Sequence, residues 1–440
     1  MDIKELYAIY KEHPVVTTDS RDVPQGSIFF ALKGESFDGN KYAVQALEKG
    51  ASYAVIDDAE VFNSAEMDET IGEKSLILVD NVLQTFKDLA REHRRQFDIP
   101  VIGITGTNGK TTTKELLSAV LSEKYNVMFT QGNFNNDVGV PKTLFRLTPE
   151  HEIAVVEMGA SHPGDIKTLV ETAEPTCGLI TNVGRAHLQG FGSFEGVKKT
   201  KGELYDSLAP NPSPTRRGEW NDSPFVFLNT KDADLCEMAE QRGVKTEAYV
   251  DGRVLKCDPY LSVELEDGTV IHTKLIGSYN VVNVLAALTV GRHFGVSDEQ
   301  IVHALENYKP SNNRSQLTVT EKNRLVVDAY NANPTSMAAA IDNFRLIETD
   351  LKKMAILGDM KELGEVSEKE HQTIVAKLDE AAFDEVWLVG EMFEKTAPGY
   401  RCFANVDEVK AAIAATPIAN RFILIKGSNS TKLFQLPELL

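Results

Sequence analysis

The sequence contains little cysteine and little tryptophan, with four residues of the first type and two of the second among 440. The cysteines Cys177, Cys236, Cys257 and Cys402 lie far apart along the chain. Their spacing fits neither a zinc site nor a disulfide framework. Free thiols of this kind are typical of proteins in a reducing compartment, so we expect a cytoplasmic protein.

Long apolar runs are missing as well. No apolar stretch reaches the roughly 18 residues that a membrane-spanning helix needs, so we expect no membrane association. The first five residues, Met1-Asp2-Ile3-Lys4-Glu5, are charged and lack the apolar centre of a secretory signal.

Basic residues are fewer than acidic residues. The 46 Lys and Arg residues stand against 65 Asp and Glu residues, which gives a formal net charge of −19. Proteins that bind nucleic acid usually present a basic face, so we expect no nucleic-acid partner. A phosphate ligand remains compatible with this charge, because a few local donors and a magnesium ion can hold it.

The residues that are abundant indicate an ordinary globular protein, with 42% hydrophobic and 25% charged residues. A chain of 440 residues is too long for one hydrophobic core and predicts two or three domains. The pattern changes twice along the chain, and we expect three domains over residues 1–82, 83–310 and 311–440. A proline-rich stretch at 209–224 reads as an exposed loop.

The first region shows short β-prone runs at 27–32 and 51–56, with a helix expected over 41–49. The other two regions alternate short apolar runs with helical segments, which is typical of parallel sheets with crossover helices. A hairpin is expected within 258–275, and helices over 194–208, 280–294, 336–348 and 367–380. The strands expected in these regions are 101–105, 153–157, 177–182, 225–228, 325–328, 354–357, 385–389 and 422–426.

A glycine-rich segment, Gly103-Ile104-Thr105-Gly106-Thr107-Asn108-Gly109-Lys110-Thr111-Thr112, lies between an expected strand and an expected helix. In that context backbone N–H groups and the helix N-terminus bind phosphate. Lys110 is expected to reach the β and γ phosphates of ATP, and the Thr111 hydroxyl to bind Mg²⁺. The general pattern has glycine where this chain has Ile104, so a ligand-free turn is the alternative. The Gly-Lys-Thr register favours the nucleotide site.

Two residues just past strand ends are candidates for the same site. Glu157 ends the expected strand 153–157, where an acid commonly completes a magnesium site beside a phosphate loop. Taken alone, it could be a solvated rim residue. His187 follows the strand 177–182 on the side where open α/β sheets bind ligands. Its position alone leaves a structural and a functional role equally open.

Lys201 lies on the apolar stripe of the expected helix 194–208. It follows Val197 by four residues and precedes Leu204 by three, so it shares their face of the helix. A lysine on an inward face is costly unless it is paired or modified. The alternative is a side chain that extends along the edge of the stripe to solvent.

These motifs resemble the Mur ligases, the ATP-dependent amide-forming enzymes of peptidoglycan precursor synthesis. The phosphate loop is similar to that of the family, including its shifted glycines. Further segments are similar to the branch that adds D-alanyl-D-alanine, and they cover all three regions. They are Asp19-Ser20-Arg21, 29–39, 132–141, Asp328-Ala329-Tyr330-Asn331-Ala332-Asn333-Pro334 and 357–364.

The resemblance implies an α/β protein of three domains. The first would be a small α/β domain that binds the UDP-sugar substrate. The second would be a P-loop ATPase domain with a mostly parallel sheet, and the third a Rossmann-like doubly wound ligase domain. The implied reaction joins D-alanyl-D-alanine to UDP-N-acetylmuramoyl-tripeptide through an acyl phosphate and forms ADP. The family further implies a monomer that acts in cell-wall biogenesis, cell shape and division.

The resemblance also assigns site residues. Thr111 and Glu157 would bind one Mg²⁺ and His187 a second, and Lys201 would be carbamylated by CO₂ and bind metal. Lys110, His187 and Lys201 are the implied catalytic residues. The implied nucleotide contacts are Gly106, Thr107, Asn108, Gly109, Lys110, Thr111, Thr112, Asn280, Asn283, Arg314, Asp328 and Tyr330. The implied substrate contacts are Ser20, Arg21, Asn135, Asn136, Asn331 and Asn333.

The chain departs from the family pattern at three positions. Asn313 precedes Arg314 where glycine is usual, Asn429 stands where this branch commonly has arginine, and Tyr279 stands where histidine is frequent. Two other functions stay open at this point. One is a sister ligase of the Mur or folylpolyglutamate type that adds a different amino acid. The other is a regulatory P-loop NTPase.

Overall fold

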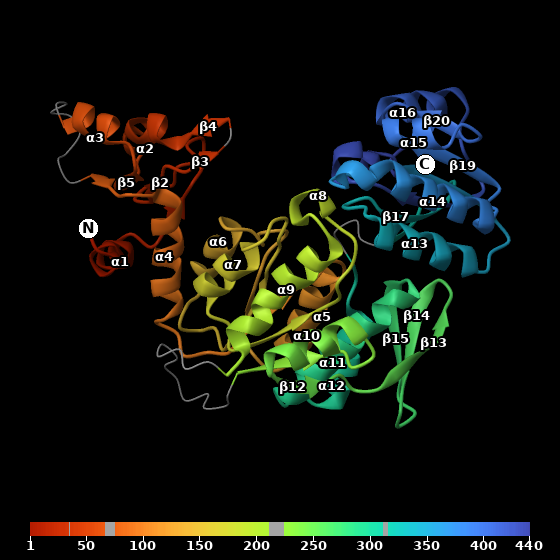
Figure 1. Cartoon of the computed structure of the whole chain (residues 1–440), viewed down its shortest axis with the longest axis horizontal. Helices are drawn as coiled ribbons and strands as arrows, with labels where there is room; N and C mark the ends of the chain where they lie inside the picture. The colour runs from red at the N-terminus through yellow and green to blue at the C-terminus, as the bar shows by residue number, and fades with distance from the viewer. Residues whose placement is uncertain (35, 67–74, 211–223, 311–315) are drawn as a thin grey trace.

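The computed structural model describes residues 1–34, 36–66, 75–210, 224–310 and 316–440. Three α/β units follow one another along the chain, with the N-terminal unit at the left of Figure 1 and the C-terminal unit at the upper right. Each unit has a sheet of mostly parallel strands, so the predicted α/β architecture is confirmed. Among the described residues no helix has the length and apolar character needed to cross a bilayer. The exact boundaries between the domains stay a prediction.

The N-terminal unit is built on a four-stranded parallel sheet in the order β1-β2-β5-β6. Its last helix, α4, packs on α1 and also on α6 and α7 of the next unit, so it joins the two. The elements are α1 (Ile3–Glu12), β1 (Val16–Thr17), β2 (Ile28–Phe30), β3 (Lys33–Gly34), β4 (Phe37–Asp38), η1 (Gly39–Tyr42), α2 (Ala43–Glu48), β5 (Tyr53–Ile56), α3 (Ala59–Glu66), β6 (Leu76–Leu78) and α4 (Val82–Arg94).

The central unit contains a six-stranded parallel sheet in the order β12-β11-β10-β7-β9-β8. From β7 the chain runs to β8 at one edge of the sheet, returns to β9 and then continues to β10 on the opposite side of β7. The order of strands therefore reverses between β7 and β10, which is the topological switch point of the sheet. Its first elements are β7 (Val101–Thr105), α5 (Lys110–Ser122), β8 (Val127–Phe129), α6 (Gly139–Leu144), β9 (Ile153–Glu157), α7 (Asp165–Ala173), β10 (Cys177–Ile180), α8 (Leu188–Phe191) and α9 (Phe194–Leu208).

The remainder of the central unit completes this sheet and adds an antiparallel one, β13-β14-β15. The hairpin expected within 258–275 is its β14–β15 pair. The elements are β11 (Phe225–Leu228), α10 (Ala233–Arg242), β12 (Lys245–Ala248), β13 (Gly252–Cys257), β14 (Tyr260–Leu265), β15 (Val270–Ile276), η2 (Ser278–Asn280), α11 (Val281–His293) and α12 (Asp298–Asn307).

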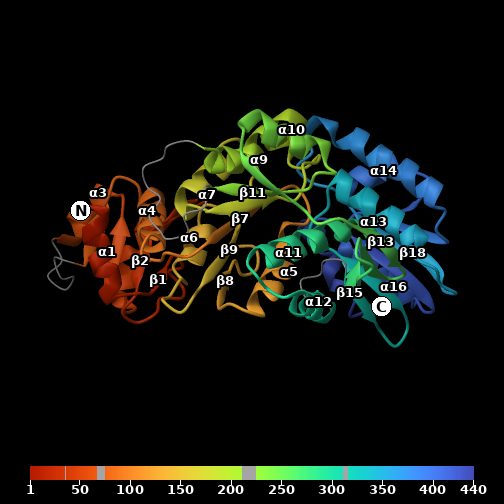
Figure 2. The same cartoon turned by 90° about the horizontal axis from the view of Figure 1, so that it is seen from below.

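Two hydrophobic cores cover the two faces of the central parallel sheet, and Figure 2 shows helices on both sides of it. Successive residues of a strand point to opposite faces. Ile102 and Ile104 of β7 therefore pack against α5 and α11, while Val101 belongs to the core that includes α7 and α9. Because both faces are buried, the strands of this sheet are continuous apolar runs, and that is why the sequence reveals them.

The C-terminal unit has a six-stranded sheet in the order β16-β17-β21-β18-β19-β20. All pairs are parallel except β16–β17, so the predicted doubly wound unit carries an antiparallel edge strand. The elements are β16 (Gln316–Val319), β17 (Arg324–Asp328), α13 (Pro334–Leu346), β18 (Lys352–Gly358), η3 (Gly364–Val366), α14 (Ser367–Ala381), β19 (Glu385–Val389), α15 (Glu391–Thr396), β20 (Arg401–Phe403), α16 (Val406–Ala415), β21 (Arg421–Lys426), η4 (Asn429–Thr431) and η5 (Leu433–Gln435).

Helix α13 begins two residues earlier than the predicted range 336–348. The Asn333 side chain accepts the N–H of Ser336 and caps the helix, and Pro334 occupies the first turn. Both features favour a helix start at this point. The capping residue Asn333 also contacts Asn108 in the loop after β7, so the start of α13 takes part in the site described below.

Two glycines allow helix α9 to lie close against the central sheet. Gly103 of β7 and Gly178 of β10 are paired in register. A Cβ atom at Gly178 would lie 2.5 Å from the carbonyl oxygen of Gly103 and 3.3 Å from the Leu204 side chain of α9. A Cβ atom at Gly103 would lie 3.1 Å from the same leucine. The small residues therefore set the distance between the sheet and the helix that carries Lys201.

We predict that Gly178→Ala destabilises this part of the fold by about 1–3 kcal/mol, because overpacking here meets a backbone atom that cannot rotate away. The expected observation is faster amide hydrogen exchange in β10 and α9 than in the parent protein. Gly399→Ala is the matched control, since a Cβ atom at that position meets nothing within 4 Å. Equal exchange in the two variants would contradict the prediction.

Candidate active site

A cavity of about 780 Å³ lies between the central and C-terminal units. Its walls come from the loop after β7, the ends of β9 and β10, the start of α11 and the segment after β17. This is the carboxyl edge of the parallel strands, where open α/β sheets bind ligands. The predicted site residues that line it are Thr107, Asn108, Gly109, Lys110, Thr111, Thr112, Asn135, Asn136, Glu157, His187, Asn280, Asn283, Asp328, Tyr330 and Asn331.

The phosphate loop runs from the end of β7 to the first residue of α5. Gly106 and Gly109 have φ values of 143° and 83°, a region that favours glycine. A Cβ atom on Gly106 would lie 2.0 Å from the Thr181 hydroxyl oxygen, and one on Gly109 would lie 2.8 Å from Asn283 Oδ1. Lys110 donates from Nζ to the carbonyl oxygens of Gly106 and Thr107, at 2.7 and 3.1 Å. The ammonium group therefore lies over the loop, at the positive end of α5.

Residues that follow β10 hold the loop in place. The Asn108 carbonyl oxygen accepts from Thr181 Oγ1 at 2.6 Å and from Asn182 Nδ2 at 2.9 Å. The Asn108 N–H donates to Asn182 Oδ1 at 3.0 Å. Sequence reasoning assigned no role to Thr181 and Asn182, although their place directly after a buried strand was a usable signal.

Thr111 and Glu157 meet at the bottom of the cavity. Glu157 Oε1 accepts from Thr111 Oγ1 at 3.2 Å and from Asn135 Nδ2 at 2.8 Å. The side chain is almost fully buried, and its Oε2 atom has no hydrogen-bond partner within the described chain. An unsatisfied buried carboxylate oxygen beside a hydroxyl matches the oxygen ligands that Mg²⁺ prefers. Both residues therefore fit a magnesium ion, with nucleotide phosphates as further ligands.

His187 follows β10 and lines the same cavity. Its side chain contacts Glu362 of the C-terminal unit through Nδ1. Burial lowers the pKa of the imidazole below its usual value, the carboxylate of Glu362 acts in the opposite direction, and the charges of Lys110 and Lys201 lower it further. The balance favours a neutral ring, which is the form that binds metals.

Lys201 lies on the inward face of α9, as its position on the apolar stripe predicts, and its side chain is 2% exposed. It does not line the cavity, and its Nζ lies 5.6 Å from the centre of the Phe191 ring. Burial holds the pKa of the amine well below its usual value, and the charge of Lys110 adds to the effect. A neutral amine is therefore favoured at this position.

Asn280 and Asn283 begin helix α11 and form the side wall. Asn283 donates from Nδ2 to Asn280 Oδ1 at 2.8 Å and accepts from Thr113 at 3.0 Å. Asn280 donates to the Ile276 carbonyl oxygen at 2.8 Å. The two amides are thus oriented by the protein, and Tyr279 lies beside them at the cavity wall.

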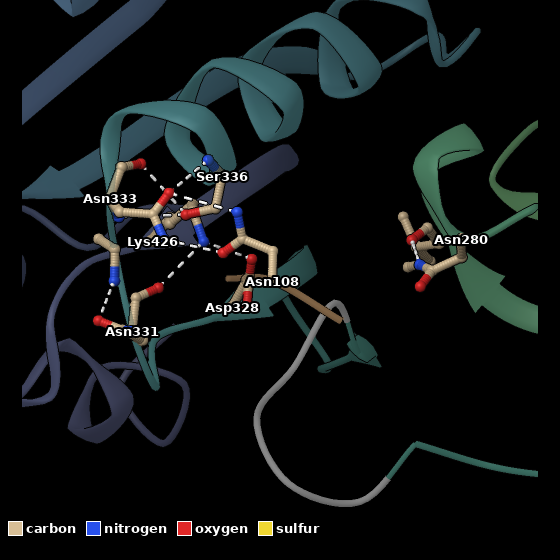
Figure 3. A network of polar contacts seen from close by, with 9 residues as sticks. Asn108, Asn280, Asp328, Asn331, Asn333, Ser336 and Lys426 are labelled. Atoms are coloured by element: carbon tan, nitrogen blue, oxygen red, sulfur yellow. Dashed lines mark hydrogen bonds and ion pairs between the residues drawn. The ribbon is translucent and has the colours of Figure 1, made fainter. Parts of the chain in front are cut away.

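The opposite wall belongs to the C-terminal unit and is drawn in Figure 3. Asp328 ends β17 and Lys426 ends β21, and the two are paired in register. Lys426 Nζ donates to Asp328 Oδ2 at 2.6 Å and to the Asn331 carbonyl oxygen at 3.2 Å. Sequence reasoning missed Lys426. Its position at a strand end was visible in the sequence, but the strand that carries its partner Asp328 lies almost a hundred residues earlier, so the pairing was not.

Asn333 connects the C-terminal unit to the phosphate loop. Its Nδ2 donates to Asn108 Oδ1 at 2.8 Å, and Asn108 Nδ2 lies 3.5 Å from Asn333 Oδ1. The same Asn333 oxygen caps α13 by accepting from Ser336 at 2.9 Å. Figure 3 shows the two asparagines side by side. Asn333 is not among the residues that line the cavity, so in this structure its amide serves a contact between units.

The remaining predicted residues lie elsewhere. Gly106 shapes the loop without lining the cavity. Ser20 is buried in the N-terminal unit, and Arg21 is exposed there and pairs with Asp19 at 2.7 Å. Neither lines the cavity. Arg314 lies outside the described residues, as does the 211–223 part of the proline-rich stretch.

Comparison with known proteins agrees with this arrangement. Residues 14–94 match the model described as "Mur ligase family, catalytic domain", residues 104–291 match "Mur ligase middle domain", and residues 313–429 match "Mur ligase, glutamate ligase domain". The UDP-N-acetylmuramoyl-tripeptide–D-alanyl-D-alanine ligase of Bacillus subtilis is 33% identical and aligns with 96% of this chain and 92% of its own length.

Two solved structures are similar over nearly the whole chain. The MurF crystal structure from Acinetobacter baumannii has a TM-score of 0.82 at 29% identity, covering 96% of this chain and 92% of that one. The MurF ligase from Thermotoga maritima in complex with ADP has a TM-score of 0.81 at 26% identity, covering 97% and 96%. The matches to both sequences and structures extend across all three units, and the chain therefore belongs to the Mur ligase family.

Proposed function

We propose that this chain is an ATP-dependent, ADP-forming ligase that joins D-alanyl-D-alanine to UDP-N-acetylmuramoyl-tripeptide in peptidoglycan precursor synthesis. The observation that carries the proposal is one cavity in which a phosphate loop, an unsatisfied buried carboxylate and the strand ends of a second unit meet. Relatives that bear the name of this ligase match the chain over almost all of its length.

The chemistry explains why such a cavity is needed. A carboxylate is a poor electrophile, and transfer of the γ-phosphoryl group of ATP converts it into an acyl phosphate with a good leaving group. Two anions must approach each other in this step, so neutralisation of charge contributes most of the catalysis. Lys110 would supply one positive charge beside the phosphates, and the loop N–H groups would add oriented dipoles.

Magnesium would be held by residues that the structure places together. Thr111 and Glu157 would be ligands of one ion, and His187 a ligand of a second. When bound, these ions neutralise phosphate charge and polarise the phosphorus–oxygen bonds. The fit rests on the free Oε2 atom of Glu157 and on the neutral imidazole of His187, both at the cavity.

We further propose that Lys201 is carbamylated. A neutral lysine amine can add to CO₂, form an N–C bond and release a proton, which converts a cation into an anionic oxygen ligand. The buried environment of Lys201 favours the neutral amine that this reaction needs. The carbamate would also remove the repulsion between two lysines, Lys110 and Lys201, that act on each other in this region.

The second step would be attack of the D-alanyl-D-alanine amine on the acyl phosphate, with loss of phosphate from a tetrahedral intermediate. The C-terminal unit, residues 311–440, would cover the ATP bound by residues 83–310 and exclude the water that hydrolyses acyl phosphates. Residues 1–82, with Ser20 and Arg21, would bind the UDP end of the tripeptide substrate. Asn135 and Asn136 would face its peptide end. We propose a cytoplasmic protein that acts as a monomer, as its family implies.

A substrate-omission assay tests the proposed reaction. Phosphate release from ATP should be sustained only when UDP-N-acetylmuramoyl-tripeptide and D-alanyl-D-alanine are supplied together, because each turnover consumes both. Release that needs neither compound would instead indicate a regulatory NTPase. Release that is supported by a different amino acid in place of the dipeptide would indicate a sister ligase.

The role of Lys201 is tested by substitution and rescue. Lys201→Ala should lower activity about 10- to 100-fold or more, as expected when a group that supports metal binding is lost. Acetate or another short carboxylate should restore part of it by occupying the space of the carbamate. Lys199→Ala is the matched control, because Lys199 is exposed on the same helix. Full activity of Lys201→Ala, or a loss that no carboxylate relieves, would show that the lysine is structural.

A further inference from the structure

Two residues with left-handed backbone conformation meet where the central and C-terminal units touch. His187 has a φ of 50° and Glu362 a φ of 61°. Residues other than glycine adopt this conformation rarely, and they do so mostly where the surrounding structure enforces a function. The Glu362 carbonyl oxygen also accepts from the Gln189 N–H at 3.2 Å. Glu362 therefore contacts the His187 side chain directly, and its backbone is bound to Gln189, two residues after His187.

The side-chain contact joins one nitrogen of the imidazole to the carboxylate. Glu362 Oε2 lies against His187 Nδ1 as an ion-pair contact, and this buried nitrogen has no hydrogen-bond partner among the described residues. A carboxylate at Nδ1 holds the proton on that nitrogen and leaves the lone pair on Nε2. Since His187 lines the cavity, Nε2 is the nitrogen that remains to bind a metal ion there.

Glu362 is held on a loop that the C-terminal unit makes rigid. His371, fully buried, donates from Nδ1 to the Ser367 carbonyl oxygen at 2.7 Å and accepts the Met360 N–H at Nε2, at 3.1 Å. Asp359, also buried, accepts the N–H groups of Met392 and Phe393 at 3.0 Å each. The loop that begins at Asp359 therefore presents Glu362 from a fixed base.

A second ion pair crosses the same boundary without touching His187. Arg185 Nη1 lies 3.1 Å from Glu370 Oε1, and the Glu370 side chain is almost buried. Figure 1 shows α8, which follows Arg185 in the chain, next to the C-terminal unit. The Glu362 contact involves the His187 ring and the Arg185–Glu370 contact does not, so a variant of each pair separates ring orientation from attachment of the two units.

We propose that Glu362 is a positioning residue that orients the His187 ring for metal binding, so that the C-terminal unit completes the second metal site of the central unit. The inference rests on the proposed role of His187 as a metal ligand. It adds that the partner which fixes the ring comes from a different domain. Metal affinity at this site and the position of the C-terminal unit are then coupled, because the Glu362–His187 contact contributes to both.

The test is the affinity for Mn²⁺, measured by the electron paramagnetic resonance signal of the free ion in the presence of a saturating non-hydrolysable ATP analogue. Loss of the partner of a metal-binding histidine typically weakens metal binding 10- to 100-fold. We expect a loss of about that size at one of the Mn²⁺ sites in Glu362→Ala. Glu362→Gln should lose less, because its amide oxygen can still accept the proton on Nδ1. Circular dichroism and thermal melting verify that each variant is folded.

Two further variants distinguish the possible failures. Arg185→Ala breaks the Arg185–Glu370 contact across the boundary and should leave Mn²⁺ affinity unchanged. If it weakens affinity as much as Glu362→Ala, attachment of the units and not ring orientation is responsible, and the inference is overturned. If His187→Ala weakens Mn²⁺ binding and Glu362→Ala does not, the inference fails while the metal role of His187 stands. If His187→Ala has no effect, the metal role itself is wrong and the inference falls with it.

Discussion

The hydrogen bonds that attach Asn108 to Thr181 and Asn182 are the interaction on which the cavity depends. They connect the turn after β7 to the end of the neighbouring strand β10, so the register of the sheet determines the shape of the phosphate loop. Donors fixed in this way need little reorganisation when charge develops near them. The same pair of strands contains Gly103 and Gly178, which allow α9 to approach and place Lys201 behind the loop. The same two strands, β7 and β10, therefore determine the shape of the phosphate loop and the position of the helix that carries Lys201.

The C-terminal unit extends this arrangement through the other end of Asn108. The main chain of that residue is bound within the central sheet, while its side chain pairs with Asn333 at the start of α13. One residue thus belongs to the phosphate loop and to the boundary between domains. Together with the Glu362–His187 contact, this places polar connections on two sides of the cavity. A change in the position of the C-terminal unit alters both walls at once, which suits an enzyme that must exclude water during one step and admit substrates before it.

Much of the secondary structure could be predicted from local sequence patterns. The contacts between residues far apart in the sequence could not. The strands β7, β9, β11 and β19 have the predicted limits because both faces of their sheets are buried, and the inward position of Lys201 follows from helical periodicity. By contrast, Lys426 reaches Asp328 only because β21 inserts between β17 and β18, and periodicity does not determine strand order. Asn333 shows a different limit. The sequence Asn333-Pro334 is a recognisable helix start, so its role as the cap of α13 was predictable. Its hydrogen bond to Asn108 depends on how two domains meet, and no local pattern indicates it.

Three lysines lie around or behind the cavity of this strongly acidic chain, and the protein treats each of them differently. They are Lys110, Lys201 and Lys426, and the last two are almost fully buried, while the formal net charge is −19. Lys426 pairs with Asp328, which supplies the partner that a buried cation requires. For Lys201, burial holds the pKa well below its usual value and the charge of Lys110 adds to this, while the carboxylates of Asp165 and Glu203 act in the opposite direction. In the proposed carbamylation, the cost of burying an ammonium group would be what makes the amine available to CO₂. In the proposed enzyme, the carbamate would replace the repulsion between Lys201 and Lys110 by an attraction, because the charge of Lys110 acts on Lys201.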